Sequence, residues 1–270
     1  MKTPSKALLC LILFAGLILR IWGLDFGLPY QFHQDEPVVV NHALAYGTGD
    51  LNPHFFAIPP LASYLLFFFY GAFFIAGKLS GLCPSAEDFA LRFFQDPTVF
   101  YLIGRFFIGV VPGVACVLLT YRFARRFLTE RSALYAAAVM AVAFLNVANS
   151  HYIYADMLLV MFTMLVFNRL LTLYEKPAMR NYCIAGIFLG LAAGAKYNGA
   201  LLAVPYFLTH LAVTRRGREK WRNVILSGKV WAGCLSAAAA FLLTNPFAVL
   251  DLPGFLGSVL RQSGAFWYTG

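Results

Sequence analysis

Two adjacent carboxylates, Asp35 and Glu36, are the residues of this chain best suited to acid–base chemistry. They end the stretch Gly23–Pro37, which directly follows the first long apolar segment. Carboxylates beside a lipid bilayer are costly, so those found there are candidates for function. We predict that Asp35 is a catalytic base and that Glu36 belongs to the same catalytic site. A solvated loop that happens to carry acids is the alternative.

Other polar residues lie near the ends of later apolar segments, from which they could converge on Asp35. They are Arg105, Asp156 and Lys196, with His33 and His151 on the same side of the membrane. Lys196 and Arg105 are predicted to bind a phosphate group, because a cation stabilises phosphate charge. Asp156 and His151 are predicted to orient an acceptor or a metal ion.

Each of these residues also has a purely structural interpretation. Arg105 could pair with Asp156 or Asp96, and Lys196 could extend its charged end to the membrane interface. His151 could be hydrogen-bonded at the end of a helix, and Asp156 could cap a helix. A divalent metal ion is possible, but no spacing of carboxylates and histidines is diagnostic of one, so no cofactor is assigned.

The composition indicates an all-α, polytopic membrane protein. Hydrophobic residues make up 60% of the chain and charged residues 12%, and the apolar residues form runs near the roughly 20 residues that a spanning helix needs. Seven spans are predicted, at 7–24, 98–121, 132–149, 157–174, 182–196, 199–213 and 230–249. No internal repeat is visible, which gives an inverted-repeat transporter no support. The five cysteines form neither a CxxC pair nor a cluster with histidine, so they suggest no disulfide framework or zinc site.

The charge pattern predicts the topology. The net charge of +9 does not indicate nucleic-acid binding, because the basic residues gather in short loops between apolar runs, at 122–131, 169–180 and 215–229. With these loops and the N-terminus in the cytoplasm, the apolar segment 61–77 cannot cross the membrane. We therefore predict that 61–77 is re-entrant or lies along the membrane and that Asp35 faces outward. In the rival topology 61–77 spans, the first segment does not, and Asp35 is cytoplasmic.

The first outer loop, 25–97, is predicted to hold the acidic pair and short helices beside the membrane. Val38–Tyr46 is predicted to be a short helix, with acids in its first turn and Pro37 at an early position. A polar loop is predicted over 78–97. Arg20, at the end of the first span, is predicted to extend toward the interface.

A polar cavity beside lipid suits a substrate with a phosphate head group and a lipid tail. In a sugar linked to polyprenyl phosphate, the lipid phosphate is already a good leaving group. One carboxylate that takes the proton from an acceptor hydroxyl is then sufficient for inverting attack on the anomeric carbon. A transporter or flippase of a lipid-linked or polar solute is the alternative, since intramembrane charges also mark transport paths. A structural or assembly subunit is a third possibility.

Five features in chain order resemble the lipid-linked sugar-dependent glycosyltransferases of the GT-C superfamily, in particular the group of protein O-mannosyltransferases and the lipid A aminoarabinose transferase. They are the pair Asp35-Glu36, the Pro-rich stretch Gly49–Tyr64, Arg105 at the start of a span, His151–Asp156, and Gly190–Asn198. The set covers residues 20–200.

This resemblance implies a GT-C fold over 1–270, with Asp35 as the base and 61–77 as a juxtamembrane helix. It also implies a polyprenyl-phosphate sugar donor, a protein, lipid or glycan acceptor, and a site on the outer face of a bacterial or archaeal plasma membrane. The chain departs from the aminoarabinose transferases after the acidic pair, where Pro37 and Val38 replace a phosphate-contacting basic residue. That departure leaves the phosphate contact to Lys196, Arg105 or His33. Members are usually longer, so we expect an N-terminal part of a larger domain.

Overall fold

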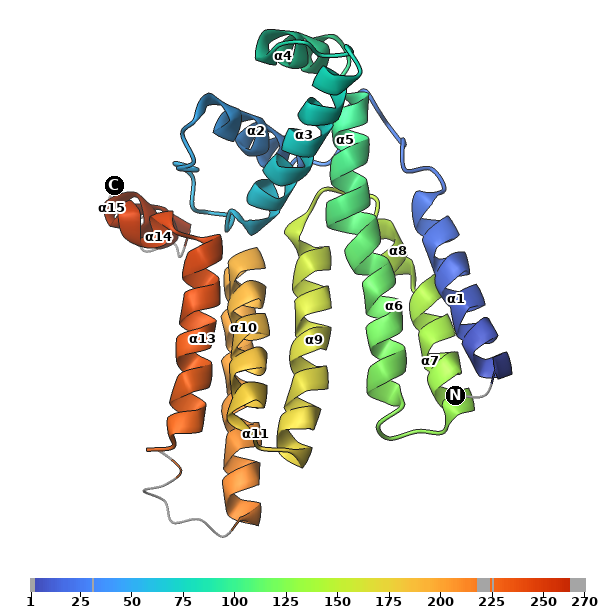
Figure 1. Cartoon of the computed structure of the whole chain (residues 1–270), viewed down its shortest axis with the longest axis vertical. Coiled ribbons are helices and arrows are strands. Elements are labelled where there is room, and N and C mark those ends of the chain that lie inside the picture. The colour runs from blue at the N-terminus through green and yellow to red at the C-terminus, as the bar shows by residue number, and fades with distance from the viewer. Residues whose placement is uncertain (1–2, 31, 218–223, 225, 263–270) are drawn as a thin grey trace. The chain divides into compact units, whose positions relative to one another are not determined.

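The computed structural model describes residues 3–30, 32–217, 224 and 226–262, and every regular element in these ranges is a helix (Figure 1). The predicted all-α fold is therefore confirmed. Part of the basic loop predicted at 215–229 lies outside the described ranges. The chain divides into two compact units, which are described separately. Unit 1 comprises Met1–Pro53 and Ala62–Leu158, and unit 2 comprises His54–Leu61 and Leu159–Gly270.

The helices follow the predicted apolar segments closely. In unit 1 they are α1 (Thr3–Ile21), α2 (Glu36–Ala45), η1 (Tyr46–Thr48), α3 (Leu61–Leu79, whose first residue belongs to unit 2), α4 (Ala86–Gln95), α5 (Thr98–Gly104), η2 (Arg105–Val110), α6 (Val111–Ala124), α7 (Glu130–Val142) and α8 (Phe144–Asn149). In unit 2 they are α9 (Ala155–Glu175, whose first turn belongs to unit 1), α10 (Met179–Ala195), η3 (Tyr197–Leu202), α11 (Ala203–Arg216), α13 (Gly228–Thr244), α14 (Phe247–Leu250) and α15 (Leu252–Gln262).

Three helical stretches of the described ranges are long and apolar enough to cross a membrane. They are Leu61–Leu79, Thr98–Ala124 and Ala155–Glu175, and α10 and α13 are shorter apolar helices. The helix α3 thus meets the length and composition of a span, and its exclusion from the membrane stays a prediction. Within unit 1, α3 lies near the α5 end of the continuous α5–α6 helix (Figure 1). There Phe69 stacks on Phe107, with 3.7 Å between ring centroids.

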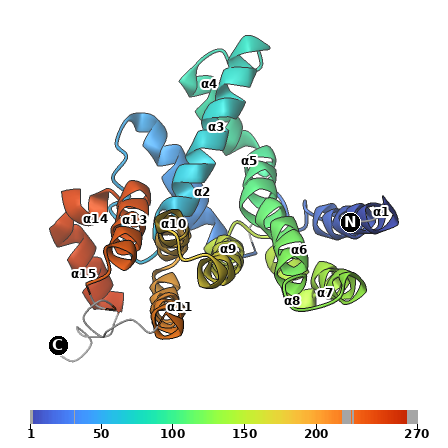
Figure 2. The same cartoon turned by 60° about the horizontal axis from the view of Figure 1, so that its bottom comes forward.

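The core of unit 1 forms where α1, α6 and α7 pack against one another (Figure 2). Its buried residues are Leu9, Val117, Tyr121, Ala124, Ala133, Leu134, Ala137 and Ala141. Ala133, Ala137 and Ala141 lie on α7, so their short side chains let α1 and α6 approach this helix closely.

The predicted span 132–149 is interrupted, which corrects the sequence prediction. Ala143 has ψ 114°, and this extended residue separates α7 from α8. Arg20 fills the break: its Nη1 donates to the carbonyl oxygens of Gly16 (2.7 Å) and Ala141 (3.0 Å), and its Nη2 donates to Asn146 Oδ1 (2.5 Å). The guanidinium therefore satisfies carbonyls at the end of α7 that have no partner within the helix.

Arg20 is fully buried, so the prediction that it extends to the membrane interface is wrong. Snorkelling requires water within reach of the long side chain. Here the end of α1 is covered by the α7–α8 break, and the break itself supplies the acceptors.

The predicted loop 78–97 contains the helix α4, which the sequence analysis missed. Ser85 accepts a hydrogen bond from the amide of Asp88 (3.1 Å), and Asp88 Oδ2 accepts one from the amide of Ser85 (3.1 Å). This reciprocal capping box starts the helix, and the spacing Ser-x-x-Asp was the available signal.

Unit 2 is built on the contact between α10 and α13, which lie side by side in Figures 1 and 2. Gly186, Gly190 and Gly194 follow one stripe of α10. A Cβ atom at these positions would collide with Gly233 O, Ala237 O and Thr244 Oγ1 of α13, respectively. The stripe therefore lets the two helix backbones approach closely, which is how membrane helices pack without a hydrophobic driving force.

The predicted span 230–249 ends early, because α13 stops at Thr244 and the chain turns at Asn245-Pro246 into α14. Proline lacks the amide hydrogen that would continue the helix.

Replacing Gly190 with Val should loosen unit 2, because the branched side chain meets the α13 backbone. We expect a destabilisation of about 1–3 kcal/mol, measured as a lower thermal unfolding midpoint of the detergent-purified protein. Gly228→Ala is the control, because a Cβ at Gly228 meets nothing within 4 Å. Equal midpoints for Gly190→Val and the parent would contradict the close approach.

Replacing Arg20 with Met should destabilise the protein by about 1–3 kcal/mol for each buried carbonyl left without a donor. The same unfolding measurement applies. Arg122→Met, at an exposed position of α6, should have little effect. Comparable losses from the two variants would argue that Arg20 does not hold the α7–α8 break.

Candidate active site

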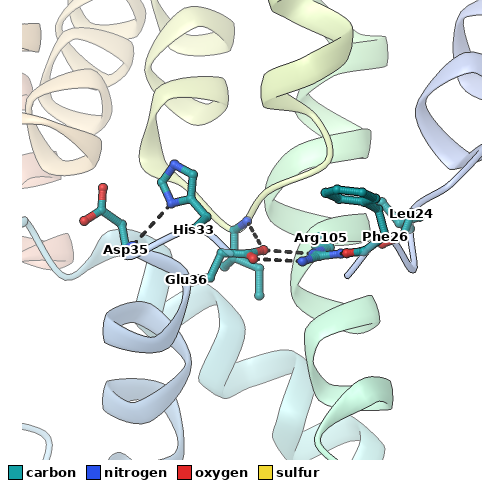
Figure 3. Close-up of polar contacts among 7 residues, drawn as sticks. Leu24, Phe26, His33, Asp35, Glu36 and Arg105 are labelled. Atoms are coloured by element: carbon teal, nitrogen blue, oxygen red, sulfur yellow. Dashed lines mark hydrogen bonds and ion pairs between the residues drawn. The ribbon is translucent and has the colours of Figure 1, made fainter. Parts of the chain in front are cut away.

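Asp35 precedes the first turn of α2, and its carboxylate does not cap that helix. Its φ of −89° and ψ of −20° are helical, and its side chain makes no capping hydrogen bond. Pro37 at an early position starts the helix without needing an amide donor. The side chain is half-buried, and its carboxylate points away from Glu36 and Arg105 (Figure 3).

Glu36, one residue later, forms a two-pronged ion pair with Arg105. Arg105 Nε donates to Glu36 Oε1 (2.9 Å), and Nη2 donates to Oε2 (2.8 Å). The side chain of Glu36 is 0% exposed and that of Arg105 is 2% exposed. Arg105 Nη1 also donates to the carbonyl oxygens of Leu24 (2.8 Å) and Phe26 (2.9 Å). This Glu36–Arg105 pair therefore joins the exit from α1, the start of α2 and the end of α5 in the continuous α5–α6 helix.

The predicted chemical roles of Glu36 and Arg105 do not fit this geometry. Both carboxylate oxygens of Glu36 and three nitrogens of Arg105 already hold partners inside the protein. A buried carboxylate with both oxygens engaged has no open edge for a substrate hydroxyl, and an engaged guanidinium is poorly placed to meet a phosphate. The structural alternative for Arg105 also needs correction, because its partner is Glu36 rather than Asp156 or Asp96.

Arg105 opens a π-helical segment, Arg105–Val110. Pro112 follows within one turn, and its missing amide hydrogen and its ring disturb the α-helical ladder just before it. Gly109 lies on the same segment, next to the backbone of Ser150. A Cβ atom at this position would collide with the carbonyl oxygen of Ser150. This helix therefore supplies the arginine and also admits the loop after α8.

That loop, 150–154, completes the surroundings of the acidic pair. The amide of Ile153 donates to Glu36 Oε1 (3.0 Å). The His33 ring contacts the rings of Tyr152 and Tyr154, with centroids 4.7 and 5.4 Å away. His33 Nδ1 accepts a hydrogen bond from the amide of Asp35 (3.3 Å). The backbone of Asp35 is thus held on both sides, through His33 and through Glu36.

His151 serves the packing of unit 1 rather than an open site. Its Nδ1 lies 2.8 Å from the carbonyl oxygen of Val147, and its Nε2 lies 2.9 Å from that of Trp22. With both ring nitrogens facing backbone oxygens, the predicted role in orienting an acceptor or a metal ion does not fit. The ring instead joins the end of α8 to the end of α1, as the structural interpretation proposed.

The far end of α2 is held against α3. Tyr46, buried at the end of α2, shares a hydrogen bond with Ser63 Oγ (3.1 Å). Burial raises the pKa of Tyr46 to about 12, so the hydroxyl stays neutral in the physiological range. Both ends of the helix that follows Asp35 are therefore fixed within unit 1.

Asp156 and Lys196 are the remaining residues predicted for the site. Asp156 is half-buried in the first turn of α9, where a negative charge suits the helix dipole; it does not occupy the cap position. Lys196 follows the end of α10 in unit 2, and the neighbouring Tyr197 donates to the carbonyl oxygen of Phe56 (2.8 Å). The phosphate-binding role of Lys196 stays a prediction.

In the part of the chain that the structure describes, no three His, Cys, Asp or Glu side chains are grouped to hold a metal ion. A divalent ion therefore stays a prediction.

Sequence reasoning missed the groups that hold the acidic pair in place. They are the backbone carbonyls of Leu24 and Phe26, the amide of Ile153, and the rings of Tyr152 and Tyr154. Backbone groups leave no residue-type signal, and they are brought to Glu36 by tertiary packing alone. The two tyrosines flanking Ile153 in the turn were the available signal.

Comparisons with known proteins agree with the fold. Residues 99–244 match the family described as dolichyl-phosphate-mannose-protein mannosyltransferase. The fold is similar to a solved structure of the Saccharomyces cerevisiae protein O-mannosyltransferase Pmt1–Pmt2 complex bound to the sugar donor, with a TM-score of 0.60 and 21% identity. The match covers 94% of this chain and 35% of that chain, so this chain spans about a third of that relative's length. No curated protein matches the sequence.

Glu36→Gln should destabilise the protein, because it leaves the buried Arg105 without its counter-charge. Removing one partner of a buried pair costs about 3–5 kcal/mol. Combining Glu36→Leu with Arg105→Met should recover part of this loss, since apolar replacements of both partners are often tolerated. Thermal unfolding of the single and double variants forms a double-mutant cycle. Purely additive effects would show that the two residues are not coupled.

Proposed function

This chain belongs to the family of dolichyl-phosphate-mannose-protein mannosyltransferases, and from that premise we propose that it moves a mannosyl group from a polyprenyl-phosphate donor to an acceptor hydroxyl. The proposal rests on the environment of the Asp35 side chain. Its half-buried carboxylate neither caps α2 nor joins the Glu36–Arg105 pair, while its backbone is held through His33 and Glu36.

Asp35 acts as the general base. Its carboxylate takes the proton of the acceptor hydroxyl as the acceptor oxygen forms a bond to the anomeric carbon. The bond from that carbon to the lipid phosphate oxygen breaks, and its electron pair leaves with the phosphate. The attack is from the opposite face, so the configuration inverts. A single carboxylate is sufficient, because the phosphate needs no protonation to leave.

Glu36 and Arg105 position this base without taking part in the proton transfer. The pair fixes the first residue of α2, and Asp35 is its direct neighbour in the chain. Accurate placement of a reacting group is a large part of catalysis, so a shift of about 1 Å can cost about 100-fold in rate. A buried ion pair with four protein hydrogen bonds on the arginine is well suited to prevent such a shift.

Within unit 1, contact with the phosphate of the donor is assigned to His33. The phosphate-binding role of Lys196, a half-exposed cation of unit 2, stays a prediction. His33 Nδ1 is taken up by the amide of Asp35, so donor contact falls to Nε2. Asp156 is retained as a residue that orients the acceptor.

Replacing Asp35 with Asn should remove the base and leave the fold intact. We expect transfer of mannose from a polyprenyl-phosphate donor to fall by about 10²–10⁴-fold, measured in membranes that contain the full-length protein. Asp25→Asn is the matched control, because Asp25 is an exposed acid of the same loop, and it should keep its activity. Full activity of Asp35→Asn at equal expression would rule out this base. Retained solute flux without any transfer would favour a transporter.

The site is proposed to face the outer side of the membrane. In a cysteine-free background, a membrane-impermeant thiol reagent should label Gln34→Cys and Ser80→Cys but not Leu128→Cys; all three positions are exposed. Labelling of position 80 without position 34 would place α3 across the membrane and Asp35 in the cytoplasm.

A further inference from the structure

An apolar pocket of about 510 Å³ lies in unit 1 between α2, α3 and α4. This volume is within the range of about 300–1,000 Å³ for small-molecule sites. None of the lining residues is an Asp, Glu, Lys, Arg or His. The pocket therefore cannot recognise a sugar phosphate by charge, and it is separate from the polar groups around Asp35.

Six of the fourteen residues that line the pocket are aromatic. Phe67 and Phe74 of α3 and Phe89 and Phe93 of α4 line the pocket. Tyr70 lines it as well, but its hydroxyl donates to the carbonyl oxygen of Phe100 (3.1 Å), so the ring is the part available to a ligand. The few polar side chains that line the pocket, such as Asn41 and Thr48, are exposed. The lining thus suits a hydrocarbon with at most a polar group at one end.

The pocket is held open by rigid packing around it. Phe89 makes edge contacts with Phe74 (5.3 Å between centroids) and Phe100 (5.0 Å), and Phe93 makes one with Phe100 (5.2 Å). These contacts fix α4 against α3 and α5. Gly71 lies in the middle of α3, where an added Cβ would meet nothing within 4 Å. A hollow next to a glycine in a helix leaves dispersion contacts unmade, and an apolar occupant would supply them.

The surroundings of the pocket favour lipid over water. Phe68 and Ile75 on α3 are 69% and 60% exposed, and Phe94, which lines the pocket from α4, is 80% exposed. The helix α3 is also apolar enough to cross a membrane. Large apolar side chains exposed around an apolar pocket allow a lipid chain to enter without crossing water.

We propose that this pocket holds one hydrocarbon chain of a bilayer lipid. The chain is an acyl chain of a phospholipid, whose head group stays outside the uncharged lining of the pocket. It would lie against α2, the helix that Asp35 immediately precedes. The proposal does not depend on the transferase activity, because it rests on the shape and lining of the pocket alone.

The test is photo-crosslinking in lipid nanodiscs. The full chain is reconstituted with a phospholipid that carries a diazirine in its acyl chain, irradiated, and mapped by mass spectrometry. We expect crosslinks within residues 67–94. Gly71→Leu, which fills the pocket from α3, should lose these crosslinks. Ala72→Leu, on the exposed neighbouring position, should keep them.

Two further arms make the result decisive. Ala90→Leu fills the pocket from α4, so it tests the same loss if Gly71→Leu does not fold, as judged by thermal unfolding. A diazirine-labelled polyprenyl phosphate replaces the phospholipid in a parallel experiment. Crosslinks that persist in folded filled variants, their absence from the parent with the phospholipid, or crosslinks from the polyprenyl phosphate alone would overturn the proposal.

Discussion

The arrangement of unit 1 around the acidic pair depends on one buried interaction, between Glu36 and Arg105. Desolvating two charges is costly, and the cost is recovered only when the geometry is good and the remaining hydrogen bonds are made. Here the pair is bidentate, the arginine reaches two backbone carbonyls of the loop after α1, and the amide of Ile153 completes the carboxylate. Four separate segments of the chain are therefore fixed relative to one another by a single pair of side chains.

Close approach of backbones makes that pair possible. Gly109 and Gly113 bring the continuous α5–α6 helix against the loop that begins at Ser150, and that loop provides Ile153. The same loop is tied to α1 through His151 and Trp22, and Arg20 holds the break between α7 and α8. The interior of unit 1 thus uses arginines and small residues together. The small residues let helices meet. Arg20 satisfies carbonyls at the α7–α8 break, and Arg105 satisfies carbonyls of the loop after α1.

The Asp35 side chain differs from the hydrogen-bonded side chains around it. Its neighbours Glu36, His33 and Arg105 all make hydrogen bonds that fix the protein, whereas the Asp35 side chain does not even cap the helix that it precedes. Adjacent acids in the sequence therefore have opposite environments: one is buried and paired, and one is half-buried and directed elsewhere. A division of this kind, with one acid inside the hydrogen-bond network and its neighbour outside the ion pair, follows from packing and not from residue type.

The amino-acid sequence alone was enough to predict the helical fold and most helix bounds, because apolar runs are a local property of a chain. It also pointed to the family. Only the tertiary structure decided the roles of Glu36 and Arg105, which are 69 residues apart. It likewise decided the burial of Arg20 and the break at Ala143, since each depends on carbonyls supplied by distant segments. Residue type shows which group can form a hydrogen bond, and packing alone decides which partner it meets.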